Sequence, residues 1–400
     1  MTNQALGNAI WAYACDLLDN DLDFALDEIA RAGLNSISVA TAYHTARLLL
    51  PHNARRKVVN LEPGMVYFRP NPTRYTNLPA PRLPREYIQR DPLGEICAAA
   101  ARHGLSVQAW TVFFHNSRLG ELHPDLTEVN CFGDRYVHAL CPSNPVARAY
   151  AVALAGDIGQ RYPIAALDVE ALGFLGYAHN SHHDKASLAL APLHHFLLSV
   201  CFCEHCAEKI RAAGAEPQKI RAAAQSELQA WFDGNRRLAT VNERDGLIEL
   251  IGEAGTRALL DARAQIVTAL IAELRRVVPP NIALQIRAAS SPFHVGGKTA
   301  GDLRAIAEHA DGFVFSFFGM PFAKFQSEVE AVPRDDVGDK PIWGGLSLAS
   351  GLPECQDKND FRQRVALLRA NGIVRFYFYN YGLMPRAGLA WIAATLEERE

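Results

Sequence analysis

Short apolar segments recur along the whole chain and alternate with polar segments in which the apolar residues have helical spacing. Eight apolar segments are rich in β-branched and aromatic residues, which is typical of β-strands. They cover residues 9–15, 36–43, 106–114, 164–170, 282–289, 312–318, 341–348 and 374–381. We therefore expect eight strands.

Amphipathic segments between these strands predict helices. The clearest cover residues 23–33, 92–104, 144–162, 300–310 and 360–372. Proline in the first turn of the third and glycine after the first support those boundaries. Strand and helix thus alternate along the chain, which favours a (β/α)8 TIM barrel. An open doubly wound sheet is the alternative, but the segment after the first strand, DLLDND, has no G-x-G-x-x-G.

Two regions are longer than a minimal barrel requires. Residues 44–91 form a loop rich in proline and arginine after the second strand. Residues 186–278 form a mostly helical excursion between the fourth and fifth strands. No Gly/Ser-rich linker separates either region from its neighbours, so we expect one TIM-barrel domain over residues 1–400 with two embellishments.

The composition narrows the class of protein. Hydrophobic residues make up 49% and charged residues 21% of the chain, and the net charge of −3 indicates no basic surface for nucleic acid. The N-terminal segment does not resemble a signal peptide and no apolar run reaches about 18 residues, so we expect no membrane partner and a cytoplasmic location. The eight cysteines are then expected as thiols or metal ligands. The sequence leaves a homo-oligomer open.

Polar side chains gather where the expected strands end, which is where TIM barrels carry their active sites. The candidates are Asp16, His44, His115, Asn116, Asp168, Glu170, Arg287, Tyr379 and Asn380. His44 and His115 have two interpretations, as substrate contacts or as structural histidines. The sixth and seventh strands end in FSFFG and WGGLS and offer no acid.

The fourth strand ends in two carboxylates, Asp168 and Glu170. Residues i and i+2 of a strand point to the same side, about 6–7 Å apart at the backbone, so both should face the barrel mouth. Two carboxylates in a half-buried site repel each other, and one then holds its proton to higher pH, as a general acid requires. The alternative is structural, because such acids also cap helices or pair with an arginine, here Arg287.

Three cysteines within six residues form the pattern C-x-C-x-x-C, namely Cys201, Cys203 and Cys206. This spacing indicates a tetrahedral zinc site, which needs a fourth ligand, and we favour Cys141 over His205. A closed site of four ligands has no open position for chemistry, so this zinc would be structural. No organic cofactor is expected. The polar segment HNSHHDK at 179–185 is a weaker metal candidate, for which a polar loop over the mouth is the favoured interpretation.

Two segments resemble a known family, HALCPSNPVARAYAVALAGDIGQRYPIAALDVEALGF at 138–174 and SVCFCEHCAEKIR at 199–211. They are similar to the glycoside hydrolase family 42 β-galactosidases, clan A barrels with the same cysteine pattern around an Asn-Glu at the end of strand four. The resemblance implies that Glu170 is the acid/base glutamate. It also implies four zinc ligands, Cys141, Cys201, Cys203 and Cys206. Two departures are that Val169 replaces the asparagine and that segment 341–348 has no nucleophilic glutamate.

The segment LDVE resembles, more loosely, the D-x-E end of the fourth strand in family 18 chitinase-type barrels. In that family the acetamido group of the substrate is the nucleophile, the aspartate orients it and the glutamate is the acid. The full D-x-x-D-x-D-x-E pattern does not occur at 163–170, which reads PIAALDVE. A substrate-assisted hydrolase of the chitinase or hexosaminidase type is therefore an alternative mechanism.

These observations together predict a glycoside hydrolase that acts on a carbohydrate. Glu170 would protonate the glycosidic oxygen, and Asp168 would orient a substrate group or, with Asp16, activate water. Five aromatic residues would stack on sugar rings or belong to the barrel core, namely Trp11, Trp110, Trp343, Tyr379 and Tyr381. The alternatives are a sugar isomerase or lyase that uses a divalent metal, and a carbohydrate-binding barrel without catalysis.

Overall fold

The computed structural model describes residues 6–178, 188–348 and 357–398. Its central element is a sheet of eight parallel strands that closes on itself, because β1 pairs with both β2 and β13. In chain order the strands are β1 (Ala9–Ala12), β2 (Ser36–Tyr43), β6 (Ser106–Val112), β9 (Ala166–Glu170), β10 (Ala283–Arg287), β11 (Gly312–Ser316), β12 (Ile342–Ser347) and β13 (Arg375–Tyr379). The predicted (β/α)8 barrel is confirmed, and the open sheet was the wrong alternative.

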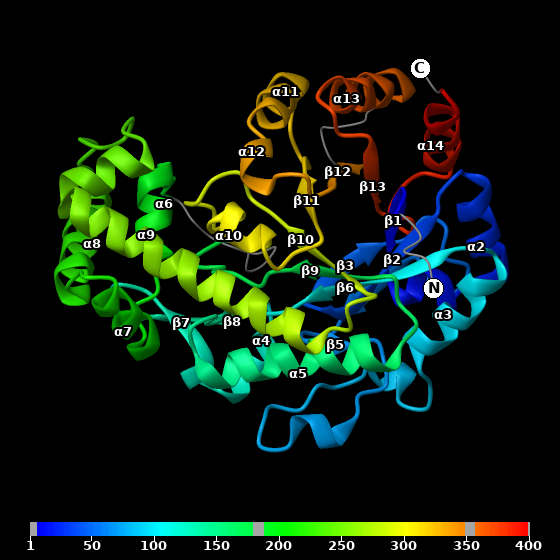
Figure 1. Cartoon of the computed structure of the whole chain (residues 1–400), viewed down its shortest axis with the longest axis horizontal. Helices are drawn as coiled ribbons and strands as arrows, with labels where there is room; N and C mark the ends of the chain where they lie inside the picture. The colour runs from blue at the N-terminus through cyan, green and yellow to red at the C-terminus, as the bar shows by residue number, and fades with distance from the viewer. Residues whose placement is uncertain (1–5, 179–187, 349–356, 399–400) are drawn as a thin grey trace.

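Helices alternate with these strands and surround the barrel (Figure 1). They are α1 (Ala14–Leu18), α2 (Leu22–Arg31), α3 (Pro92–Arg102), α5 (Pro145–Arg161), α9 (Glu243–Val277), α10 (Leu303–Ala307), α11 (Phe322–Glu330), α12 (Arg334–Val337), α13 (Lys358–Ala370) and α14 (Ala387–Glu397). The five predicted helices correspond to α2, α3, α5, α10 and α13. For α5 the start signal is local, because the Asn144 side chain caps the amides of Val146 and Ala147 and proline follows it.

The first strand is shorter than predicted and ends at Ala12. Tyr13 has extended backbone angles and begins α1, and its amide donates to the carboxylate of Asp16 at 2.8 Å. This capping contact turns the chain into a helix before the apolar run is complete. Cys15, expected in a strand, therefore lies in a helix.

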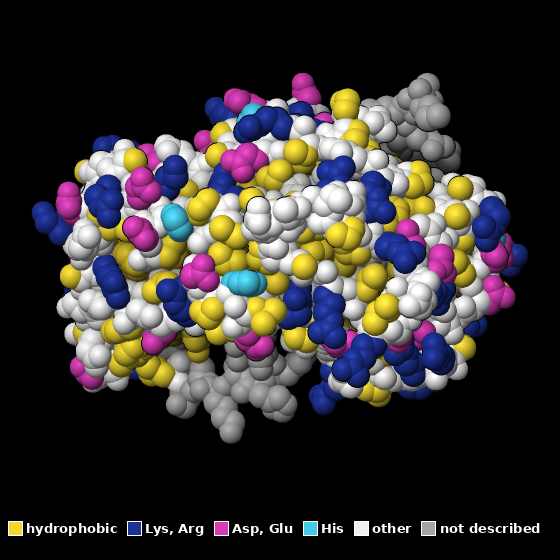
Figure 2. Space-filling model, turned by 90° about the horizontal axis from the view of Figure 1, so that it is seen from below, with side chains coloured by type: hydrophobic (Ala, Val, Ile, Leu, Met, Phe, Trp, Pro, Cys, Tyr) yellow, Lys and Arg dark blue, Asp and Glu magenta, His cyan; other side chains and the backbone are white. Residues whose placement is uncertain are grey.

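The long loop after β2 contains a hairpin of β3 (Ala46–Leu49) and β4 (Val58–Leu61), a short strand and two 3-10 turns. The short strand, β5 (Met65–Val66), pairs antiparallel with the end of β2 and so holds the loop at the rim of the barrel. The turns are η1 (Pro72–Tyr75) and η2 (Arg85–Tyr87). Residues 44–91 carry nine Lys or Arg and only three Asp or Glu, and basic side chains gather on the right of the face seen in Figure 2. Part of this charge anchors the loop, because Arg56 pairs with Asp19 and Glu86.

A second insertion, after β6, was not predicted. It comprises α4 (Ser117–Leu122), η3 (Pro124–Leu126) and an antiparallel hairpin of β7 (Thr127–Val129) and β8 (Arg135–Leu140). Its strands are too short to give a clear hydrophobic period. The hairpin leads directly into Cys141.

The excursion after β9 is helical, as predicted, and forms a lobe beside the barrel (Figure 1). It contains α6 (Pro192–Leu198), α7 (Glu204–Ala212), α8 (Pro217–Phe232) and the first part of α9. These helices enclose a small hydrophobic cluster of their own. Helix α9 has a break at Gly252, whose φ is +74°, and it packs along α5 on the barrel. The assignment of one domain over residues 1–400 stays a prediction.

Among the residues that the structure describes, no helix is long and apolar enough to cross a bilayer. The segment at 179–185, considered above as a metal site or a loop, lies outside the described residues.

Candidate active site and cysteine cluster

The interior of the barrel is lined by polar pairs spaced i, i+2 on four strands. They are Gln108 and Trp110 on β6, Asp168 and Glu170 on β9, Gln285 and Arg287 on β10, and Tyr377 and Tyr379 on β13. Strand pairing sets Trp110 and Gln285 beside Asp168 on either side. The first residue of each pair lies deeper in the barrel, where the Tyr377 hydroxyl forms hydrogen bonds with Gln108 and Gln285. The second residue of each pair lies nearer the mouth.

Asp168 is fully buried and accepts hydrogen bonds on both carboxylate oxygens. Arg287 donates from Nε to Oδ1 at 3.1 Å and from Nη2 to Oδ2 at 2.9 Å. Oδ2 also accepts from the Trp11 indole at 2.8 Å and from the Ser38 hydroxyl at 2.9 Å. A buried carboxylate needs this degree of pairing to stay charged. The contacts make Asp168 an anchor for Arg287.

Glu170 lies one layer higher, with 19% of its side chain exposed. Its Oε2 accepts from Arg287 Nη1 at 2.7 Å and from the Trp110 indole. A Cβ atom at Gly297 would come within 3.0 Å of Oε1, so this glycine lets the loop after β10 lie against the carboxylate. Among the described residues Oε1 has no hydrogen-bond donor, which leaves this oxygen for a proton or a reacting group.

The guanidinium of Arg287 lies between the two acids and against the rings of Trp11 and Trp110, 4.3 and 4.7 Å from their centroids. Burial lowers the pKa of Arg287, but the charges of Asp168 and Glu170 raise it above its ordinary value. Our expectation of two mutually repelling carboxylates omitted this arginine. Both acids do pair with Arg287, and that they also have a catalytic role stays a prediction. With both acids ionised the cluster has a charge of −1, and uptake of one proton neutralises it.

Three phenol groups meet beside Glu170 at the ends of β1, β2 and β13. The Tyr13 hydroxyl lies 3.0 Å from that of Tyr43 and 2.7 Å from that of Tyr379. The Trp110 ring packs against the first two, with centroids 5.5 and 5.0 Å away. Burial raises the pKa of all three tyrosines, and the charge of Glu170 contributes for Tyr43 and Tyr379. They are therefore neutral hydrogen-bonding groups.

The predicted histidines form a stack at the rim next to these phenols. His44 stacks on Tyr43 and on His115, with 4.2 Å between centroids in both cases. His115 is buried and its ring lies 5.7 Å from that of His138 on β8. The structure thus brings His44 and His115 together, and their contact with a substrate stays a prediction.

Asp16 and Asn380 have partners of their own. The carboxylate of Asp16 accepts from the backbone amides of Tyr13 and Gly382. Burial raises the pKa of Asp16 to about 7, although these two hydrogen bonds lower it. The side-chain oxygen of Asn380 accepts from the Gly382 amide at 3.0 Å. Both side chains hold the turn after β13 against the start of α1, and Asp16 is not part of the Asp168–Arg287–Glu170 cluster.

Two further candidates have structural positions. Asn116 caps α4, because its side-chain oxygen accepts from the Leu119 amide at 3.0 Å. Trp343 is the second residue of β12, and its indole donates to the carbonyl of Gly7, just before β1. It therefore lies at the end of the barrel opposite the mouth. The expectation that Trp343 binds substrate is corrected, since a strand residue so near the N-terminal end cannot reach the active-site face.

Ser38 and Tyr13 were not identified from the sequence as residues of the site, and they complete its two hydrogen-bond networks. Trp11 and Trp110, expected as sugar-stacking or core aromatics, are hydrogen-bond donors to the acids. The sequence does contain a signal for such residues, because polar residues such as Ser38 interrupt the apolar strands at positions that face the barrel interior. Reading every second residue of each strand, in addition to its last residue, would have indicated them.

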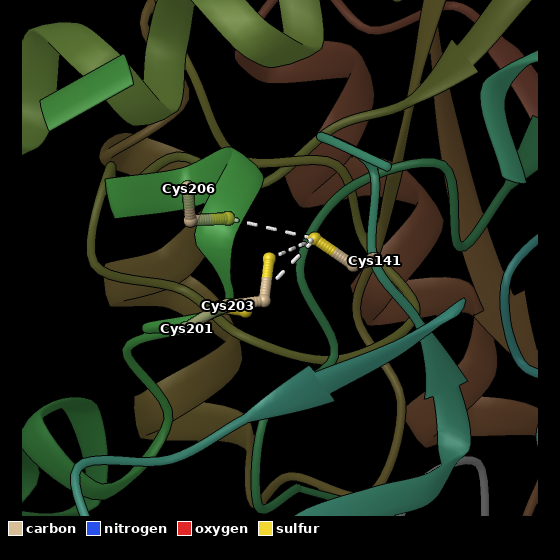
Figure 3. Close-up of side chains that lie close together, drawn as sticks. All are labelled: Cys141, Cys201, Cys203 and Cys206. Carbon is tan, nitrogen blue, oxygen red and sulfur yellow. Dashed lines mark hydrogen bonds between the residues drawn. The ribbon is translucent and has the colours of Figure 1, made fainter. Parts of the chain in front are cut away.

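The four predicted cysteine ligands converge at the junction of the barrel and the excursion. In Figure 3 the thiols of Cys141, Cys203 and Cys206 point toward one another. Cys141 follows β8, and the other three come from the segment that begins α7. The sulfur of Cys141 lies 3.5, 3.6 and 3.9 Å from those of Cys206, Cys203 and Cys201. His205, the alternative fourth ligand, is not in this group.

The geometry of the four sulfurs fits a tetrahedral zinc. Bonds of about 2.3 Å to a central zinc place the sulfurs of a tetrahedron about 3.8 Å apart. The backbone amides of Val129 and Ser143 donate to Cys201 and Cys141 at 3.4 Å each, which favours thiolates. Hydrogen bonds within the cluster lower the pKa of Cys203, whereas burial raises the pKa of Cys141. Within the described residues this is the only group of three or more His, Cys, Asp or Glu that could hold a metal ion.

Comparison with known proteins shows the fold. No family model matches the chain, and no curated protein matches it by sequence. Among solved structures, α-L-fucosidase isoenzyme 2 from Paenibacillus thiaminolyticus is 14% identical over 98% of this chain, with a TM-score of 0.58. The PgaB (BpsB) glycoside hydrolase domain from Bordetella bronchiseptica is 12% identical over 99%, with a TM-score of 0.58. The GH42 β-galactosidase Gan42B from G. stearothermophilus is 13% identical over 98%, with a TM-score of 0.57.

The extent of these matches differs. This chain spans 49% of the fucosidase and 57% of the β-galactosidase, but all of the PgaB domain. At such low identity the matches establish a common architecture, and membership of family 42 stays a prediction. The chain therefore has the TIM-barrel fold that these glycoside hydrolases share.

Proposed function

We propose that this protein is a glycoside hydrolase that acts on a carbohydrate, with Glu170 as its general acid/base. The observation that carries the proposal is the arrangement around Glu170 at the C-terminal end of β9. Its Oε2 is held by Trp110 and Arg287, whereas Oε1 is left for a reacting group. The shared architecture with glycoside hydrolases supports the substrate class.

The chemistry follows from the cluster. A proton on Oε1 of Glu170 neutralises the cluster and can be transferred to the glycosidic oxygen as the bond to the leaving group breaks. The anomeric carbon bonds to a water molecule in place of the leaving group, and the Glu170 carboxylate accepts the proton that this water gives up. Asp168 is a positioning residue in this proposal, because its hydrogen bonds are directed to Arg287, Trp11 and Ser38. The phenols of Tyr13, Tyr43 and Tyr379 are suited to sugar hydroxyls.

We also propose that the four cysteines hold a structural zinc. Four thiolates complete the tetrahedral coordination, so the metal contributes to folding and offers no position for a reactant. The cytoplasmic location, the absence of nucleic-acid and membrane partners and an open homo-oligomeric state stay predictions from composition.

The test compares Glu170→Gln and Asp168→Asn on disaccharides and on aryl glycosides with good leaving groups. Loss of the acid should lower turnover of disaccharides by about 10²–10⁴-fold, with a smaller loss on the aryl glycosides, which need no protonation. Asp168→Asn should lose activity equally on both, because it disturbs Arg287. Glu121→Gln, an exposed acid on α4, is the matched control and should keep full activity.

Chemical rescue sharpens the assignment. With Glu170→Ala and an aryl glycoside, added azide should restore turnover and give a glycosyl azide, because a small anion can enter where the carboxylate was removed. Full activity of Glu170→Gln on disaccharides would exclude Glu170 as the acid. Binding of glycans by the wild type without any turnover would instead favour the carbohydrate-binding alternative.

A further inference from the structure

The seven residues that follow Glu170, Ala171 to Tyr177, lead the chain from the catalytic candidate toward the excursion. Here they are called the post-Glu170 segment. Its first residue, Ala171, has a φ of +53°, which a residue with a side chain adopts only when its surroundings impose it. The Ala171 amide donates to the carbonyl of Gly297 at 2.8 Å, beside the carboxylate of Glu170. The position of Glu170 thus depends on how this segment is held.

The end of the segment is held by side chains, not by secondary structure. Glu128, which is fully buried on β7, accepts from the amide of Leu175 at 2.8 Å and from that of Gly176 at 3.3 Å. The Ser199 hydroxyl accepts from the Tyr177 amide at 3.0 Å. Three consecutive amides are therefore satisfied by two side chains.

Two more side chains complete the contact. The His138 ring lies with Nε2 3.1 Å from the carbonyl of Gly176. The guanidinium of Arg263, buried on α9, lies 4.2 Å from the centroid of Phe174. The segment is thus enclosed by groups from β7, β8, α9 and the end of α6.

These same groups are neighbours of the cysteine cluster. Val129, next to Glu128, donates its amide to the sulfur of Cys201 and accepts from the amide of Phe202 at 2.7 Å. Ser199 lies two residues before Cys201, and His138 lies three residues before Cys141. Arg263 lines a small cavity together with Cys201 and Cys206.

We propose that Glu128 is a positioning residue that couples the cysteine cluster to Glu170 through the post-Glu170 segment. The cluster joins the hairpin that carries Glu128 to the segment after α6 that carries Ser199, and the two side chains then fix three amides of the post-Glu170 segment. Loss of the metal would remove this joint between the two segments. The inference rests on the proposed role of Glu170 and on the proposed zinc.

Glu128→Gln is the sharpest perturbation. Burial raises the pKa of Glu128 to about 8, and in either protonation state both oxygens of its carboxyl group can accept from an amide. A glutamine side chain has one acceptor oxygen and turns its NH2 group toward the other amide. A buried donor is then left unpaired. Because the cysteines are unchanged, the variant should keep its zinc while the segment loosens.

The experiment is hydrogen–deuterium exchange measured by mass spectrometry on the protein as purified, without substrate. Glu128→Gln should exchange the amides of Leu175, Gly176 and Tyr177 at least about tenfold faster at unchanged metal content. Removal of zinc from the wild type with a chelator should have the same effect on these amides. Glu227→Gln is the matched control, because Glu227 is a largely buried acid on α8 that pairs with His194 and Arg237 and does not contact the segment.

A purely structural role would speed exchange throughout the barrel, so peptides from β12 provide an internal reference and should stay unchanged. If Glu128→Gln does not fold, Ser199→Ala provides the same test at the Tyr177 amide. Unchanged exchange of the post-Glu170 segment in the variant and after zinc removal would overturn the coupling. The result does not depend on turnover, so it can fail or hold independently of the activity of Glu170→Gln.

Discussion

Replacement of Arg287 by methionine tests the central claim that the buried acid depends on this arginine. Methionine keeps most of the length of the side chain and its packing between Trp11 and Trp110, but it removes the charge. Asp168 loses the two hydrogen bonds from Arg287 and keeps those from Trp11 and Ser38. A fully buried carboxylate is then left without a cation.

The expected magnitude follows from the burial of the pair. Removal of one partner of a buried ion pair costs about 3–5 kcal/mol. An unfolding entropy of about 2.1 cal/mol/K per residue over 400 residues amounts to about 0.84 kcal/mol/K, so Tm should fall by about 4–6 °C. Arg304→Met is the control, because Arg304 and Asp336 form an exposed pair, with 73% and 47% of the side chains exposed. Such a pair contributes about 0–1 kcal/mol, which corresponds to about 1 °C or less.

Thermal unfolding followed by circular dichroism and by tryptophan fluorescence measures both variants. The double variant Asp168→Asn with Arg287→Met adds a check, because it removes the fully buried unpaired charge of Asp168 and should be more stable than Arg287→Met alone. A Tm of Arg287→Met within 1 °C of the wild type would refute the reasoning, as would a double variant less stable than the single one.

Two further predictions concern the metal and the pH dependence. Elemental analysis of the purified protein should find about one zinc per chain. Cys203→Ser should lose the zinc and unfold at a lower Tm, whereas Cys97→Ser, which changes a buried cysteine outside the cluster, should keep its zinc. Equal zinc content in the two variants would contradict the site. Because burial raises the pKa of Asp16 to about 7, from about 3.9 in an unfolded chain, the native state holds a proton that the unfolded state releases. The contribution of Asp16 to stability is complete below about pH 4 and declines as the pH rises to 7. Between pH 4 and 7 the Tm should therefore fall less steeply in Asp16→Asn than in the wild type. Equal slopes of Tm against pH in the two proteins would contradict this prediction.

The strands and their inward faces could be predicted from local sequence. The side-chain period of two is a property of the extended backbone, so Asp168 and Glu170 had to share a face wherever β9 lay. The three cysteines of C-x-C-x-x-C are also close in sequence, and the spacing alone indicated a common ligand. The capping contact of Asp16 with Tyr13 is equally local, because the two residues are three positions apart.

The tertiary structure decided what these residues contact. Arg287 is 117 residues from Glu170, and the pairing of β10 with β9 places its guanidinium between the two acids. Strand register decided that Trp343 lies at the end opposite the mouth. The contacts of Glu128 require the β7–β8 hairpin, the post-Glu170 segment and the segment that carries the cysteines to pack together. No local sequence pattern predicts this packing. The sequence determined which side chains face the interior, because that depends on neighbouring residues alone. Their partners depend on pairings between distant segments, which exist only once the barrel has closed.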